Sequence, residues 1–153
     1  MARLEDLHPD QRTAALNLAL PQFDSTPWVT PPPLKEARVA LISTAGLHRR
    51  DEERFRGGAV DYRVIPGDID PAELIMSHLS INFDRSGFQQ DVNVVFPLPH
   101  LRTLAAAGEI GSLARWHYSF MGATDPVRIA ESGAEVGRLL KGDGVDAVLL
   151  APV

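Results

Sequence analysis

The sequence contains no cysteine among its 153 residues. This absence excludes disulfide bonds, thiolate metal sites and thiol redox centres within these residues. No apolar stretch approaches the roughly 20 residues that a membrane-spanning helix needs. The N-terminal stretch MARLEDLHPDQR is acidic and polar, unlike a secretory signal. With 44% hydrophobic and 23% charged residues, the composition is that of a globular domain. We expect a cytoplasmic protein.

Motifs for nucleotide and metal binding are also missing. The sequence has neither GxGxxG nor GxxxxGK[ST], so nothing supports a nucleotide site. No short metal-ligand spacing such as HxH or HExxH occurs among the histidines, which are His8, His48, His78, His100 and His117. A net charge of −5 disfavours nucleic acids and anionic membranes as partners. We therefore expect no metal, nucleic acid or membrane.

The chain divides into an N-terminal arm and one larger domain. Residues 8–20 have a helical pattern, with Pro9 at a position suited to the first turn. Residues 21–33 contain Pro21, Pro27 and the run PPP, which cannot continue a helix and favours an extended path. We therefore predict an N-terminal helix and proline-rich arm over residues 1–33, followed by an α/β domain over residues 34–153.

Strand-like and helix-like stretches alternate in this domain. The strand-like ones are Ala37–Ser43, Asp61–Ile65, Trp116–Met121 and Val145–Leu150, with Asp91–Phe96 as a short strand or strand-like turn. The first and last of the four main stretches are apolar enough to be buried strands. This order predicts a mostly parallel sheet flanked by helices, in a Rossmann-like arrangement of three layers that is incomplete at the C-terminus.

Capping residues and glycines mark the predicted helices. Asp70 and Pro71 suit a helix start, Gly108 ends a helix over residues 99–107, and a further helix begins near Pro126. Two glycines on that last helix, Gly133 and Gly137, would let it lie close against the sheet. Because the chain ends on an apolar strand, we also expect an exposed apolar surface there.

The densest polar cluster is SHLSINFDRSGFQQD, which spans residues 77–91. Arg85 offers a planar fork for a carboxylate, while His78 and Asp84 could exchange protons with a substrate. Asp91 closes the cluster and is a further candidate for substrate binding or proton transfer. The alternative is structural, with Asp84 and Arg85 pairing with each other or with neighbouring turns.

Two further histidines are candidates for substrate binding or proton transfer. His48 follows the first predicted strand, and His117 lies in the aromatic segment WHYSFM. Each is alternatively a partly buried structural histidine. The charged stretch RRDEERFRGG, residues 49–58, favours a solvated helix or turn over a phosphate site.

Five segments together resemble a known family. They are WVTPPPLKEARVALISTAGLH, DYRVIPGD, SHLSINFDRSGFQQDVNVVFPLPHLRTLAAAGEIG, HYSFMGATDP and GVDAVLLAPV. In this order they are similar to the selenocysteine-containing B subunit of the glycine, sarcosine and betaine reductases and of D-proline reductase. The resemblance covers about residues 28–153 and leaves the N-terminal helix outside.

The resemblance implies where the reactive residue lies. In that family the strand that corresponds to VDAVLLAPV leads directly into a redox motif whose first residue is selenocysteine or cysteine. It therefore implies such a nucleophile directly after Val153 and no catalytic nucleophile within the 153 residues. Because selenocysteine is encoded by a codon ordinarily read as stop, we expect that the reading was terminated there. A degenerate gene or a deliberate truncation is the alternative.

The resemblance also implies an activity and partners. The family's reaction is reductive cleavage of a carbon–nitrogen bond in an amino acid or methylated amine. It implies a partner subunit that carries a pyruvoyl group, a thioredoxin-like dithiol donor and an oligomeric assembly. Two other hypotheses remain open from the residues alone. One is a non-catalytic binding or scaffold subunit that ends at Val153, and the other is a redox-independent hydrolase or lyase that uses His78 and Asp84.

Overall fold

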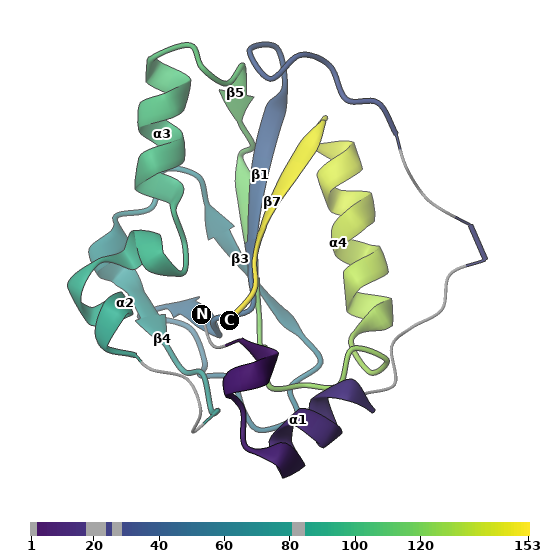
Figure 1. The fold of residues 1–153 in the computed structure, drawn as a ribbon. Coiled ribbons are helices and arrows are strands. Elements are labelled where there is room, and N and C mark those ends of the chain that lie inside the picture. The colour runs from purple at the N-terminus through teal and green to yellow at the C-terminus, as the bar shows by residue number, and fades with distance from the viewer. Residues whose placement is uncertain (1–2, 18–23, 26–28, 81–84) are drawn as a thin grey trace.

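The computed structural model describes residues 3–17, 24–25, 29–80 and 85–153 (Figure 1). The chain begins with a 3₁₀ turn, η1 (Leu4–Asp6), and a short helix, α1 (Pro9–Leu16). Pro9 occupies the first turn of α1, as the sequence predicts, because its missing N–H would have no partner there in any case. Residues 18–23 and 26–28 of the predicted helix and arm lie outside the described residues.

The central sheet is organised around its first strand. β1 (Arg38–Ser43) pairs in parallel with β5 (Ser112–Leu113), β6 (Trp116–Phe120) and β7 (Ala147–Ala151). β3 (Tyr62–Pro66) pairs with β6 in the antiparallel direction. Two further strands, β2 (Leu47–Arg49) and β4 (Leu74–Met76), form a separate antiparallel pair.

The sheet is mixed, so the prediction of a mostly parallel sheet is wrong. Parallel strands need a long crossover connection, which is usually a helix. The segment between β2 and β3, residues 50–61, contains only turns and loop. β3 therefore returns antiparallel against β6. The broader prediction of an α/β fold with helices flanking a sheet is confirmed.

Helices pack on both faces of the sheet (Figure 1). α3 (Leu98–Ala106) buries Leu98 and Leu101 in one apolar cluster, whose β1 members are Val39 and Leu41. α4 (Ala130–Gly142) contributes Val136 and Leu140 to a second cluster, which contains Ala40, Tyr118 and Phe120. Successive residues of a strand point to opposite faces, so β1 supplies both clusters by alternation.

The remaining helical elements are short. They are the five-residue α2 (Ser86–Gln90) and the 3₁₀ turns η2 (Pro71–Glu73) and η3 (Val92–Val94). Asp70 caps η2, since its carboxylate accepts a hydrogen bond of 2.9 Å from the backbone N–H of Ala72. The predicted helix start is therefore present, but β4 follows after a single turn. Within residues 91–96, predicted as a short strand or strand-like turn, Val92–Val94 form the 3₁₀ turn η3 and no strand is present.

Gly133 and Gly137 do not bring α4 close to the sheet. A Cβ atom added at either glycine would meet nothing within 4 Å, and both residues are exposed. The contact face of α4 is instead formed by the larger side chains of Val136 and Leu140. The prediction of a glycine-mediated close approach is therefore wrong.

An acidic side chain fixes the turn between α4 and β7 to its neighbours. The Asp143 carboxylate accepts hydrogen bonds from the Arg38 guanidinium, at 2.8 Å, and from the backbone N–H of Arg115, at 2.9 Å. Burial raises the pKa of Asp143, but these hydrogen bonds outweigh burial and hold the pKa below its usual value. The hydrogen bonds of Asp143 consequently hold the start of β7 beside the start of β1.

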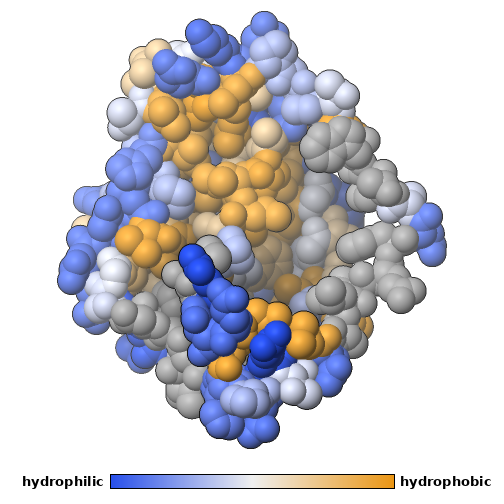
Figure 2. Space-filling model, in the orientation of Figure 1, coloured by the Kyte–Doolittle hydropathy of each residue, from blue (hydrophilic) through white to orange (hydrophobic). Residues whose placement is uncertain are grey.

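The residues of β7 are more exposed than the predicted buried strand requires. Val148, Leu149 and Leu150 are 38%, 41% and 65% exposed. Within the described part of the chain, β7 pairs with β1 alone, so its other edge has no strand neighbour. Figure 2 shows hydrophobic surface along the middle of this face, where β7 lies between α3 and α4 in Figure 1. The expected apolar surface is present.

This surface predicts self-association of the 153-residue chain. Exposed apolar strands without charged side chains tend to pair with other chains. Replacing Leu150 with lysine is expected to weaken self-association at least about tenfold, because a charge would have to be buried in the contact. Sedimentation velocity over a range of concentrations measures the effect.

A matched control is available elsewhere on the surface. Val127 is 66% exposed, close to the value for Leu150, but it precedes α4 and is not part of β7. Val127→Lys should leave the association unchanged. A monodisperse monomer at every concentration, or an equal effect of Val127→Lys, would contradict the assignment of the contact to β7.

Candidate functional site

The carboxyl ends of β1, β6 and β7 meet at one edge of the sheet, because these three strands are parallel. Thr44 joins all three ends. Its carbonyl accepts a hydrogen bond of 2.8 Å from the N–H of Gly122, which follows β6. Its own N–H donates to the carbonyl of Ala151, at 3.2 Å, and its Oγ1 accepts from the N–H of Val153, at 2.8 Å. In α/β sheets, ligands commonly bind beyond such an edge.

Gly122 allows the three strand ends to come this close. A Cβ atom at this position would lie 2.6 Å from the carbonyl oxygen of Thr44 and 2.8 Å from that of Val153. Both neighbours are backbone atoms, which cannot rotate away as a side chain could. Only glycine fits without displacing one of the strands.

A second glycine connects the edge to the predicted polar cluster. Gly46 has φ = 65°, a conformation that favours glycine. Its N–H donates to the carbonyl of Phe120, at 2.9 Å, and its carbonyl accepts from the N–H of Ser77, at 2.9 Å. A Cβ atom at Gly46 would lie 3.1 Å from the backbone nitrogen of His78. The start of the polar cluster thus lies against the end of β1.

His78 and Arg85 are brought together here. The Arg85 guanidinium donates a hydrogen bond to the carbonyl of His78, and the N–H of Ser80 donates to His78 Nδ1 at 3.2 Å. Burial lowers the pKa of His78, and the nearby Arg85 lowers this pKa further. The His78 imidazole is therefore neutral at pH 7, with its proton on Nε2 because Nδ1 accepts from Ser80, and it can take up a second proton only by giving up that hydrogen bond.

Both residues line a cavity of about 300 Å³. Its other lining residues are Arg54, Phe55, Ile75, Met76, Ser77 and Leu79. Arg54 and Arg85 supply positive charge, and guanidinium groups are suited to bind carboxylates. The cavity has the chemistry to hold a small anionic group beside the strand ends.

His117 lies in the core, near the start of β6 rather than its end. It is 0% exposed, and its Nδ1 accepts a hydrogen bond of 2.9 Å from the backbone N–H of Leu41. The proton of the neutral ring is therefore on Nε2, which is buried and has no partner among the described residues. Burial lowers the pKa of His117 to about 4, with a smaller contribution in the same direction from Arg102.

The other predicted site residues are not part of this cavity. His48, on β2, is 2% exposed and its Nδ1 is 2.7 Å from the carbonyl of Arg49. Asp91 is exposed and caps η3, accepting hydrogen bonds from the N–H and the side-chain amide of Asn93. These hydrogen bonds lower the pKa of Asp91. Asp84 lies outside the described residues.

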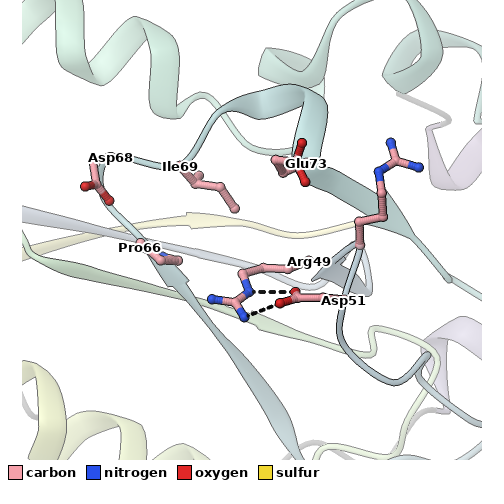
Figure 3. Close-up of a pocket in the computed structure, with 7 residues that line it drawn as sticks. Arg49, Asp51, Pro66, Asp68, Ile69 and Glu73 are labelled. Atoms are coloured by element: carbon pink, nitrogen blue, oxygen red, sulfur yellow. Dashed lines mark hydrogen bonds and ion pairs between the residues drawn. The ribbon is translucent and has the colours of Figure 1, made fainter.

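A second cavity, of about 470 Å³, lies at the end of β3 (Figure 3). Because β3 is antiparallel, Pro66 at its end pairs with Trp116 at the start of β6, so this cavity is at the opposite edge of the sheet. In it, the Arg49 guanidinium forms two hydrogen bonds with the Asp51 carboxylate, at 3.0 and 2.8 Å. This pairing leaves little of the Arg49 charge for a ligand.

Thr44 and Gly122 are site residues that local sequence patterns did not predict. The segments TAGLH and HYSFMGATDP were both noted, and a small polar residue after a buried strand is a weak signal for a strand-end site. In the structure, the two residues form a direct contact between segments nearly eighty positions apart, which no local pattern records.

No group of three or more His, Asp or Glu side chains in the described ranges is arranged to hold a metal ion. None of the helices in that part of the chain is both long and apolar enough to span a membrane.

Comparisons with known proteins agree with the segment-by-segment resemblance. The sequence profile of the family described as "Glycine/sarcosine/betaine reductase selenoprotein B" matches residues 10–153. This match includes most of α1, so the expectation that the N-terminal helix lies outside the family is wrong. No solved structure matches the chain, and the predicted Rossmann-like arrangement stays a prediction.

Curated relatives are considerably longer than this chain. D-proline reductase subunit gamma of Acetoanaerobium sticklandii is 40% identical over 133 residues, which cover 80% of this chain and 54% of the relative. Glycine reductase complex component B subunit gamma of Carboxydothermus hydrogenoformans is 29% identical over 142 residues, covering 87% and 32%. Betaine reductase complex component B subunit beta of Peptoclostridium acidaminophilum is 27% identical over 139 residues, also covering 87% and 32%.

The chain thus spans about half the length of the first relative and about a third of the other two. The family profile, in contrast, matches nearly the whole chain, and the identity to the first relative extends over most of it. The resemblance inferred from the five segments is confirmed, and the chain belongs to the glycine/sarcosine/betaine reductase selenoprotein B family.

Proposed function

We propose that this chain is the N-terminal part of a reductase subunit that cleaves the carbon–nitrogen bond of an amino acid or methylated amine. In this proposal a selenocysteine or cysteine follows Val153 directly and is the nucleophile. One observation carries the proposal beyond family membership: Val153 is hydrogen-bonded into the strand-end edge, through Thr44, beside the ends of β1 and β6. A residue attached there would emerge at this edge.

The chemistry agrees with the composition of the chain. With no cysteine in the 153 residues, the chain itself offers no thiolate for a reductive step. A selenolate would supply an ionised nucleophile at neutral pH, whereas a thiol with its ordinary pKa of about 8.5 is mostly protonated. Cleaving the carbon–nitrogen bond takes up two electrons and two protons, which a dithiol donor provides as it is oxidised to a disulfide.

His78 and Arg85 are the residues that we propose for the substrate. Arg85 and the neighbouring Arg54 would bind a carboxylate in the cavity of about 300 Å³. His78 would accept a proton, because its lowered pKa leaves the ring neutral at pH 7, and the proton on Nδ1 would replace the hydrogen bond from Ser80. His48, Asp84, Asp91 and His117 stay as predicted candidates for substrate binding or proton transfer.

The assembly is proposed on the basis of the relatives' names. The glycine and betaine reductase relatives are described as subunits of a complex component. We propose a pyruvoyl-containing subunit and a thioredoxin-like dithiol donor as partners, an oligomeric assembly and a cytoplasmic location. The division into an arm over residues 1–33 and a domain over residues 34–153 is likewise proposed.

The nucleotide sequence after the Val153 codon tests the proposed nucleophile. The expected result is an in-frame UGA or cysteine codon, followed by an open frame that encodes a further cysteine within a few residues. A different stop codon with no continuing frame would contradict the proposal and favour a binding or scaffold subunit that ends at Val153. The encoded protein should then open the ring of D-proline, or release ammonia or an amine from glycine, sarcosine or betaine, only when a dithiol and the partner subunit are present.

A further inference from the structure

The pairing of β1 with β7 is irregular at its last step. In a regular parallel ladder, the carbonyl of Ala151 accepts from the N–H of Thr44, and the carbonyl of Thr44 then accepts from the N–H of Val153. The first of these bonds is present, at 3.2 Å. At the second, Val153 donates to the side-chain Oγ1 of Thr44, at 2.8 Å. A hydroxyl group thus takes the place of a backbone acceptor.

The carbonyl of Thr44 is engaged with a different strand. It accepts a hydrogen bond of 2.8 Å from the N–H of Gly122, directly beyond β6. Gly122 can approach this closely because it has no Cβ atom, which would lie 2.6 Å from the Thr44 oxygen. Thr44, the residue directly after β1, therefore supplies two acceptors, with its carbonyl bonded to the segment after β6 and its hydroxyl to the segment after β7.

We infer that Thr44 is a positioning residue for the residue that follows Val153. This inference rests on the proposed function, in which that residue is the nucleophile. The hydroxyl holds the backbone of Val153 in line with β7 after the regular ladder has ended. Thr44 thereby sets the direction in which the residue after Val153 leaves the sheet. Gly122 limits the space that is available to that residue on the side of β6.

The inference requires a hydroxyl and not merely a side chain of this size. Valine has nearly the same shape as threonine but cannot accept the hydrogen bond from Val153. Serine keeps the hydroxyl and loses only the methyl group. Thr44→Val and Thr44→Ser therefore separate positioning by the hydrogen bond from packing by the methyl groups.

Two measurements on the chain test this separation. The first is amide hydrogen exchange of Val153 in the ¹⁵N-labelled 153-residue chain, followed by NMR. The second is the mobility of a nitroxide spin label on a cysteine added after Val153, followed by electron paramagnetic resonance. Thr44→Val is expected to accelerate exchange at Val153 about tenfold, the effect of losing one hydrogen bond, and to increase the mobile fraction of the label. Thr44→Ser should resemble the unsubstituted chain in both measurements.

Thr103→Val is the matched control. The Thr44 hydroxyl both accepts from the N–H of Val153 and donates to its carbonyl oxygen, at 3.4 Å, whereas the Thr103 hydroxyl donates to the carbonyl of Pro99, at 3.2 Å, and lies on α3. It should change neither measurement at the end of β7. The inference is overturned if Thr44→Val leaves Val153 unchanged, if Thr44→Ser has the same effect as Thr44→Val, or if exchange rises equally along all of β1.

The outcome is independent of the test of the proposed function. The added cysteine reports on the geometry of the exit from β7 whatever residue the gene encodes there. Absence of a selenocysteine or cysteine codon would remove the proposed nucleophile, while the exchange and mobility data would still decide whether the Thr44 hydroxyl fixes Val153.

Discussion

An alanine at position 122 is expected to lower the free energy of unfolding by about 3 kcal/mol. Its Cβ atom would lie 2.6 Å from the carbonyl oxygen of Thr44 and 2.8 Å from that of Val153, closer than nonbonded atoms approach. Because both oxygens belong to the backbone, relief requires the ends of β1 and β7 to move away from β6. Urea unfolding followed by circular dichroism measures the change.

Gly133→Ala is the control for replacing a glycine. A Cβ atom at Gly133 meets nothing within 4 Å, and the residue lies inside α4. Alanine is the better helix former, so this substitution is expected to raise the free energy of unfolding by up to about 1 kcal/mol. Equal effects of the two substitutions, or an unchanged stability of Gly122→Ala, would show that the strand ends are not held in the close contact described above.

The second large effect is a loss of stability in mild acid caused by His117. The pKa of this histidine is about 4 in the folded chain, against 6.5 for an unperturbed histidine. Between these values the unfolded chain binds a proton that the folded chain does not, so stability falls as the pH is lowered. The full stability is present above about pH 6.5, and the shift corresponds to a loss of about 3 kcal/mol by pH 4.

His117→Asn isolates this contribution from the other titrating groups. The Oδ1 atom of asparagine can accept the hydrogen bond from the Leu41 N–H that Nδ1 of His117 now accepts, and asparagine does not titrate. The variant should therefore lose less stability than the unsubstituted chain between about pH 7 and pH 4.5, whatever its stability at neutral pH. Urea midpoints at several pH values provide the comparison. Parallel pH profiles for the two proteins would contradict the burial of a neutral His117.

Patterns within a few residues predicted most of the individual elements. The strand predicted over residues 37–43 is β1, which starts one residue later, and the helix predicted over residues 99–107 is α3, which is shifted by one residue. Gly108, predicted to end that helix, has φ = 70°, which glycine adopts without strain. These features depend on apolar periodicity and on the conformations that single residues allow, and both can be recognised from the sequence alone.

Local patterns also identified the polar cluster of residues 77–91, but they did not predict the tertiary surroundings of the candidate site residues. His78 and Arg85 do meet, because they are close in the chain and joined by a hydrogen bond. His117 appeared equivalent to them in the sequence, yet it is fully buried against Leu41, and Asp91 is an exposed cap. Residue type indicated what each side chain could do, whereas its surroundings depend on which distant segment packs against it.

The amino-acid order alone therefore determined the class of the fold, the approximate positions of its main strands and helices, and the family, through long segments in a specific order. The tertiary structure decided the antiparallel direction of β3, the exposure of β7 and the roles of the glycines. Gly122 is at a close contact and Gly133 and Gly137 are not, because a missing Cβ matters only where another segment occupies its place. The hydrogen bonds of Thr44 to Gly122, Ala151 and Val153 also depend on tertiary structure, because folding brings these distant segments to the end of β1.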